Sequence, residues 1–279
     1  MTTLGGIQNI VFSGEGPEEP KIITVLGDEK SGKSVLTTQL MDWPSEGAKP
    51  LVIAADSRGV DACAEVGIRV PHIKLKDVGV YDGNGASRAQ ATIIDRADAL
   101  LRDLRVKWKK FDPKKPDAFP FSSLVFDCAS SYGQYAITAI DETNLNPDKR
   151  SDYGLLAESF RRIFVGLKDL GVPVIFYAWW RHAQKIQIDK NTSKFDPGGA
   201  DIPGQWSKSL TGLSDQILIL EKTPGGQKDS PYLCSDGFER KLYTRTHKGT
   251  PAGGRYQSRL NEVEPADLGT VLAKLMRMI

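Results

Sequence analysis

The sequence predicts an α/β fold with a mostly parallel sheet flanked by helices. Short apolar runs of strand length alternate along the chain with segments of ten or more residues that carry helical patterning, and this order is typical of parallel sheets. The 279 residues contain no internal repeat and no clear linker. We therefore expect a single domain over residues 1–279, with residues 1–20 as a lead-in segment.

The composition argues against several classes of protein. Hydrophobic residues make up 40% and charged residues 26%, with a formal net charge of only +2, so nucleic-acid binding would have to rest on a local basic patch. Cys63, Cys128 and Cys234 lack CxxC or Cys/His spacing, which argues against disulfides or zinc and predicts a reducing cytoplasm. No stretch approaches ~20 apolar residues and the N-terminus has no basic start, so we expect neither a membrane span nor a signal peptide.

Each expected strand is a short run of aliphatic or β-branched residues. The runs PLVIAA at 50–55 and SLVF at 123–126 are of the kind expected for strands buried on both faces. We expect strands at Lys21–Leu26, Pro50–Ala55, Arg69–Leu75, Ser123–Phe126, Val172–Ala178 and Asp215–Leu220, followed by late strands at Arg240–Thr246 and Arg255–Leu260 in a C-terminal β-hairpin region.

The expected helices carry apolar residues at helical spacing. In the segment Ala86–Lys109, residues such as Ala97, Leu100 and Leu104 fall on one face. The further expected helices are Lys33–Met41, Tyr153–Leu170 and a C-terminal helix from Pro265 within residues 261–279. Prolines interrupt 111–120, which we expect to be a loop, and 181–205 is polar, glycine-rich and without clear pattern.

One short segment carries the most specific signal in the chain. GDEKSGKS at 27–34 matches the phosphate-loop pattern GxxxxGK[ST], and it lies between an expected strand and an expected helix. Its glycines let backbone N–H groups close around phosphate oxygens, Lys33 reaches the β/γ-phosphates and the Ser34 hydroxyl binds Mg²⁺. The expected nucleotide-binding residues are Gly27, Asp28, Glu29, Lys30, Ser31, Gly32, Lys33, Ser34 and Val35.

The acidic residues within this loop, Asp28 and Glu29, have two interpretations. The middle positions of such a loop contribute backbone groups, so both side chains can form a solvated crest. Alternatively, they contact a basic residue of a neighbouring subunit. We favour the first interpretation.

Two further carboxylates follow expected strands. Asp127 ends the run LVFD, where it would bind Mg²⁺ together with Ser34; the alternative is a strand-end turn. Asp56 follows PLVIAA and is the candidate general base, with helix N-capping as an equally weighted alternative. The expected catalytic set is therefore Lys33, Asp56 and Asp127.

These motifs occur in an order that resembles the RecA-like recombinase ATPases. The nearest resemblance is to phage-encoded AAA-family nucleotide-binding proteins of the Sak-type single-strand-annealing group, over about residues 20–260. It rests on GDEKSGKS, PLVIAADSRG, LVFDCASS and DIPGQWSKSLTGLSDQILILE, in that order. The resemblance implies a RecA-like P-loop NTPase core with ATP and Mg²⁺ as cofactors. It also implies ATP hydrolysis coupled to single-stranded DNA in phage recombination or replication, in the cytoplasm of the host cell.

The resemblance also assigns roles to the residues after the expected strand Val172–Ala178. Arg181 or His182 would sense the γ-phosphate, although the double tryptophan before them departs from the family pattern. A mobile DNA-binding loop would follow, and the alternative is a β-hairpin insertion with solvated lysines. The DNA-binding candidates, a basic set with one aromatic ring for stacking on bases, are Arg181, Lys185, Lys190, Lys194 and Phe195.

Finally, RecA-like proteins place nucleotide at a subunit interface, which implies a homo-oligomer. Arg245, Lys248 and Arg255 are the candidates for a basic residue that completes the neighbour's site. The alternative is exposed basic residues on an edge hairpin. A single-strand-binding protein is compatible as a partner. A different class of function, a nucleotide-gated scaffold with little hydrolysis and a protein partner, stays open.

Overall fold

The computed structural model describes residues 22–56, 58–82, 84–85, 87–88, 90–109, 121–143, 149–187, 192–225 and 229–279. The expected lead-in at 1–20, the proline-interrupted loop at 111–120 and the candidate Lys190 lie outside these residues.

A single mixed sheet forms the centre of the fold, with strand order β12-β10-β9-β1-β5-β4-β2-β3. The pairs from β9 to β3 are parallel, whereas β10 pairs antiparallel with both β9 and β12. The predicted α/β core, mostly parallel and ending in an antiparallel C-terminal region, is confirmed. The strands of this path are β1 (Ile22–Gly27), β2 (Lys49–Ala54), β3 (His72–Lys74), β4 (Phe121–Asp127), β5 (Val174–Arg181), β9 (Gln216–Pro224), β10 (Phe238–Tyr243) and β12 (Val263–Pro265).

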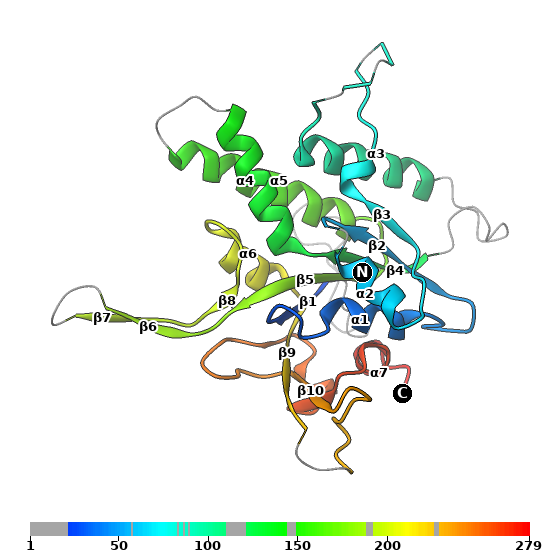
Figure 1. Ribbon diagram of the computed structural model, residues 1–279, viewed down its shortest axis with the longest axis vertical. Helices are drawn as coiled ribbons and strands as arrows, with labels where there is room; N and C mark the ends of the chain where they lie inside the picture. Colours follow the sequence, from blue (N-terminus) through cyan, green and yellow to red (C-terminus); the bar gives the residue numbers. More distant parts are fainter. Residues whose placement is uncertain are drawn as a thin grey trace, which may run out of the picture.

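Helices cover both faces of this sheet (Figure 1). Alternation along β1 explains why, because Ile22 and Leu26 join one hydrophobic cluster while Ile23 and Val25 join the other. The first face is covered by α3 (Ile93–Lys109), α4 (Ala129–Thr143), α5 (Lys149–Lys168) and α6 (Trp206–Leu213). The second is covered by α1 (Lys33–Leu36), the 3₁₀ turn Thr37–Leu40, α2 (Arg58–Glu65) and α7 (Leu268–Leu275).

Several predicted boundaries are corrected by local hydrogen bonding. Helix α3 begins at Ile93 rather than Ala86, because Thr92 and Asp95 form a capping box in which the Asp95 N–H donates to Thr92 Oγ1 at 3.2 Å. The predicted first helix is only one α-turn followed by a 3₁₀ turn. The strand predicted at Arg255–Leu260 was wrong: a 3₁₀ turn, Gln257–Arg259, occupies it, and the strand follows at β12.

The polar segment after β5 forms a β-hairpin, which was the alternative to the expected mobile DNA-binding loop. Strands β6 (Gln184–Gln187) and β7 (Ser193–Asp196) pair antiparallel and project away from the central sheet (Figure 1). Two short strands, β8 (Gly199–Ala200) and β11 (Gly253–Gly254), add to β5 and β9 respectively. Among the described residues, no helix is both long and apolar enough to cross a membrane.

Candidate nucleotide-binding site

The phosphate loop joins the fully buried strand β1 to α1 at the carboxyl edge of the parallel strands. The side chain of Lys33 turns back onto this loop, and its Nζ donates to the carbonyl oxygens of Gly27 at 2.6 Å and Asp28 at 2.7 Å. Burial lowers the pKa of Lys33. Gly32 has φ 101°, in the left-handed region that favours glycine. The loop therefore has the strand–turn–helix geometry that the motif requires.

Ser34 and Asp127 meet beside this loop. Asp127 ends β4, is 8% exposed and lies beside the Ser34 hydroxyl, which acts to lower the pKa of the carboxyl. Burial raises the pKa of Asp127 to about 6, and the nearby charge of Asp56 acts in the same direction. A hydroxyl and a carboxylate are the hard oxygen donors that Mg²⁺ prefers.

Gly59 lies directly beside Ser34 and Asp127. A Cβ built at Gly59, in the first turn of α2, would lie 1.9 Å from Asp127 Oδ2 and 2.7 Å from Ser34 Oγ. The absence of a side chain at Gly59 therefore allows α2 to approach the two oxygen donors. Sequence reasoning did not select this glycine, because nothing local marks it.

Asp56 combines features of both its predicted roles. Its Oδ2 accepts a hydrogen bond from Ser131 Oγ at 2.6 Å, and its Oδ1 accepts one from the Arg58 N–H at 3.0 Å, at the start of α2. The second bond resembles the predicted helix cap. Asp56 also lines a pocket of about 410 Å³ together with Lys76 and Tyr135, so part of the carboxylate's surroundings is open to a ligand.

Of the two sensor candidates, His182 contacts the phosphate loop. Its Nε2 lies 2.8 Å from Asp28 Oδ1, and its ring packs against Trp180 with centroids 4.0 Å apart. Arg181 instead pairs with Asp196 of β7 at 3.4 Å. The two acidic residues of the expected loop crest, Asp28 and Glu29, are both exposed, and Asp28 is the residue that His182 contacts.

The three candidate trans-acting residues are each paired with a carboxylate of the same chain. Lys248 and Arg245 form ion pairs with Glu221 and Glu262, and Arg255 Nη1 lies 3.7 Å from an oxygen of a third carboxylate, Asp215. Because Arg255 is 73% exposed and Arg245 is 52% exposed in their side chains, neither is fixed by burial.

Of the described DNA-binding candidates, Lys185, Lys194 and Phe195 lie on hairpin β6–β7, whereas Arg181 ends β5. Lys185 faces Phe195 across the two strands, and Ile186 faces Lys194, so each face of the hairpin carries one lysine and one apolar side chain. Phe195 is 59% exposed and Ile186 is 42% exposed. Each exposed apolar side chain therefore lies next to one lysine, and the two pairs are on opposite faces of the hairpin.

A basic residue that the sequence did not reveal also contacts the phosphate loop. Arg240 of β10 donates from Nε to the Ser31 carbonyl oxygen at 3.0 Å, while its two terminal nitrogens bind Asp236 at 2.8 and 2.6 Å. Arg240 and Ser31 are 209 residues apart, so no local motif could have joined them.

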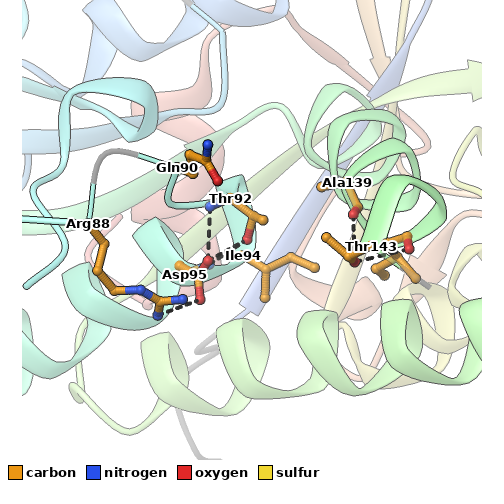
Figure 2. A pocket seen from close by; sticks show the side chains of 8 residues that line it. Arg88, Gln90, Thr92, Ile94, Asp95, Ala139 and Thr143 are labelled. Atoms are coloured by element: carbon orange, nitrogen blue, oxygen red, sulfur yellow. Dashed lines mark hydrogen bonds and ion pairs between the residues drawn. The ribbon is translucent and has the colours of Figure 1, made fainter. Parts of the chain in front are cut away.

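The structure also contains a pocket of about 750 Å³ away from the phosphate loop. Figure 2 shows Arg88, Thr92 and Asp95 on one side of it, and Ala139 and Thr143 of α4 on the other. Arg88 pairs with Asp95 at 3.7 Å, so these charged groups already satisfy one another. The signature residues of nucleotide binding are not among its lining residues.

Comparisons with known proteins relate the chain to a family of domains and to a solved structure. Among solved structures, the chain is similar to a KaiC-like protein, PH0186, from the hyperthermophilic archaeon Pyrococcus horikoshii OT3, with 13% sequence identity and a TM-score of 0.42. The alignment covers 85% of this chain and 84% of that one. No curated protein matches the chain. A family model described as "AAA domain" matches residues 19–256, which include the phosphate loop and both carboxylates, and the chain therefore belongs to this AAA domain family.

Proposed function

We propose that this protein binds and hydrolyses ATP in a Mg²⁺-dependent reaction. The observation that carries the proposal is the position of Asp127 beside Ser34, because it brings a buried strand-end carboxylate next to the phosphate-loop hydroxyl. These two oxygen donors fit a magnesium ion, which keeps several waters and takes its remaining ligands from the nucleotide phosphates. The bound ion would neutralise charge on the β- and γ-phosphate oxygens.

The protein residues take complementary roles in this reaction. Lys33 exchanges its bonds to the loop carbonyls for phosphate oxygens, and the loop N–H groups hold the same phosphates. Asp56 orients and deprotonates the attacking water, and its hydrogen bond from Ser131 fixes the orientation of the carboxylate. His182, which contacts Asp28, responds to occupation of the loop.

We further propose that turnover is coupled to single-stranded DNA through hairpin β6–β7, in phage recombination or replication. The support is the exposed Lys185, Lys194 and Phe195 on a projecting hairpin. Because His182 lies between the end of β5 and the start of β6, the nucleotide site and the proposed DNA contact share one segment of chain. A homo-oligomer in the host cytoplasm, working beside a single-strand-binding protein, fits this role.

The test is ATP hydrolysis by purified protein, with and without single-stranded DNA, at low salt because phosphate contacts weaken with salt. We expect several-fold stimulation by DNA that is lost in Lys33→Ala. A double variant, Lys185→Ala with Lys194→Ala, should lower the log–log salt slope of DNA binding by about 1.4, or about 0.7 for each lost phosphate contact. The matched control replaces two exposed lysines on helices, Lys168 and Lys208. An unchanged slope in the hairpin variant would refute the DNA contact.

One observation favours a second candidate function, a nucleotide-gated scaffold with little hydrolysis. Both oxygens of Asp56 already accept hydrogen bonds, from Ser131 and from the Arg58 backbone, which leaves this carboxylate less free to accept a proton. If this second function is correct, ATP binds as tightly as the first proposal requires, but the rate of ATP hydrolysis stays near background with or without DNA. A protein partner whose binding depends on the nucleotide would then be the object to isolate.

A further inference from the structure

Arg240 lies against the outer side of the phosphate loop. Its side chain is only 16% exposed, and its Nε donates to the Ser31 carbonyl oxygen at 3.0 Å. A Cβ built at Gly32 would lie 2.9 Å from the same Nε. The guanidinium and the Ser31–Gly32 peptide are therefore packed against each other, with no room for a side chain between them.

The direction of this hydrogen bond determines the direction of a neighbouring donor. In a trans peptide the C=O and the following N–H point in opposite directions, and the Ser31–Gly32 bond is not among the cis peptides of the chain's described residues. Arg240 holds the Ser31 carbonyl outward, so the Gly32 N–H points to the inner side of the loop. That inner side is where backbone N–H groups of a phosphate loop meet the α- and β-phosphates.

Asp236 fixes the guanidinium in this position. It accepts two hydrogen bonds from the terminal nitrogens of Arg240, a bidentate arrangement that leaves Nε directed at the loop. This contact holds the pKa of Asp236 well below its ordinary value, so the pair stays charged across the physiological range. Lys222 lies 3.7 Å from the same carboxylate and adds a second positive charge on β9.

We infer that Arg240, held by Asp236, is a positioning residue that presets the Gly32 N–H as a donor to the nucleotide's diphosphate. The residue acts through the loop backbone, from within the same chain. The inference rests on the proposed nucleotide binding and adds to it a residue that the phosphate-loop motif does not contain.

The test measures binding of ADP and ATP to Arg240→Ala by titration calorimetry, alongside the melting temperature. We expect the affinity for both nucleotides to fall about tenfold and to the same extent, the effect of one charge-assisted hydrogen bond. The kcat at saturating ATP should change much less, because the Gly32 donor binds ground state and transition state alike. A purely structural role would lower the melting temperature without this split between KM and kcat.

Lys241→Ala is the matched control, because it removes the same charge from the next residue of the same strand, whose side chain lies on the opposite face. If Arg240→Ala fails to fold, Asp236→Asn replaces it, since it keeps the arginine but frees it from its bidentate partner. Wild-type affinity for ADP in Arg240→Ala and Asp236→Asn would overturn the inference. Failure of the wild-type protein itself to bind ADP would instead refute the proposed function.

Discussion

The burial of Asp127 predicts that removing its charge stabilises the protein. The environment raises the pKa of Asp127 from 3.8 to about 6, a shift of roughly two units at about 1.36 kcal/mol each. Keeping this carboxylate ionised at pH 8 therefore costs about 3 kcal/mol. In Asp127→Asn the amide keeps the shape of the carboxylate beside Ser34, while the buried charge is gone. We expect the variant to be up to ~3 kcal/mol more stable at pH 8, or roughly 2–4 °C in melting temperature for each kcal/mol.

The pH dependence gives the sharper test. Because the folded-state pKa lies above the unfolded value, the protonated form of Asp127 contributes stability below about pH 4, and this contribution is lost as the pH rises through 6. The advantage of Asp127→Asn should thus be largest above pH 6 and shrink by about half at pH 5. The assay is urea unfolding between pH 5 and 8 without metal or nucleotide, with exposed Asp201→Asn as control. A less stable Asp127→Asn, or an advantage independent of pH, would refute the argument. With Mg²⁺ and ATP added, the wild type should become more stable than Asp127→Asn, because only the wild type gains stability from binding these ligands.

Three other changes follow from the same site. Gly59→Ala would place a methyl group 1.9 Å from Asp127 Oδ2. The Mg²⁺-dependent affinity for ATP should therefore fall at least tenfold, and the free energy of unfolding should fall by about 1–3 kcal/mol. Metal titration and unfolding measure the two effects, and unaltered metal affinity would contradict the close approach. Ser131→Ala frees one oxygen of Asp56, so kcat should fall several-fold with KM unchanged in steady-state kinetics, whereas an equal change in both would speak against an orienting role. Alkylation of the native protein at pH 8 should occur at Cys234, because burial raises the thiol pKa of the other two cysteines to about 11; peptide mapping by mass spectrometry would reveal modification elsewhere.

The parts of the site that could be predicted from the sequence are those that depend on local chain geometry. GDEKSGKS is contiguous, and each of its roles follows from a strand, a turn and a helix in succession. Asp56 and Asp127 could be expected near the loop because the carboxyl ends of neighbouring parallel strands meet at one edge of a sheet. The structure places Asp127 beside Ser34 on that edge.

The contacts that could not be predicted depend on distant pairing. Arg240 reaches Ser31 through the antiparallel register of β9 with β10, and His182 reaches Asp28 across 154 residues. Helix α4 was missed for another reason. Its inward face includes small residues such as Ser130, Ser131 and Gly133, which bury against the sheet without giving the apolar periodicity that identifies a helix.

The position of β1 in the sheet has a mechanical consequence. Its two neighbours, β5 and β9, both run on past the phosphate loop, β5 into hairpin β6–β7 and β9 into its antiparallel pairing with β10. A paired strand is stiff along its length, so a small tilt near the loop becomes a larger displacement at the far end of each hairpin. The phosphate loop thus lies between the two strands that lead into these projecting segments. A change in the conformation of the loop on ligand binding would displace hairpin β6–β7 and the β9–β10 pair together.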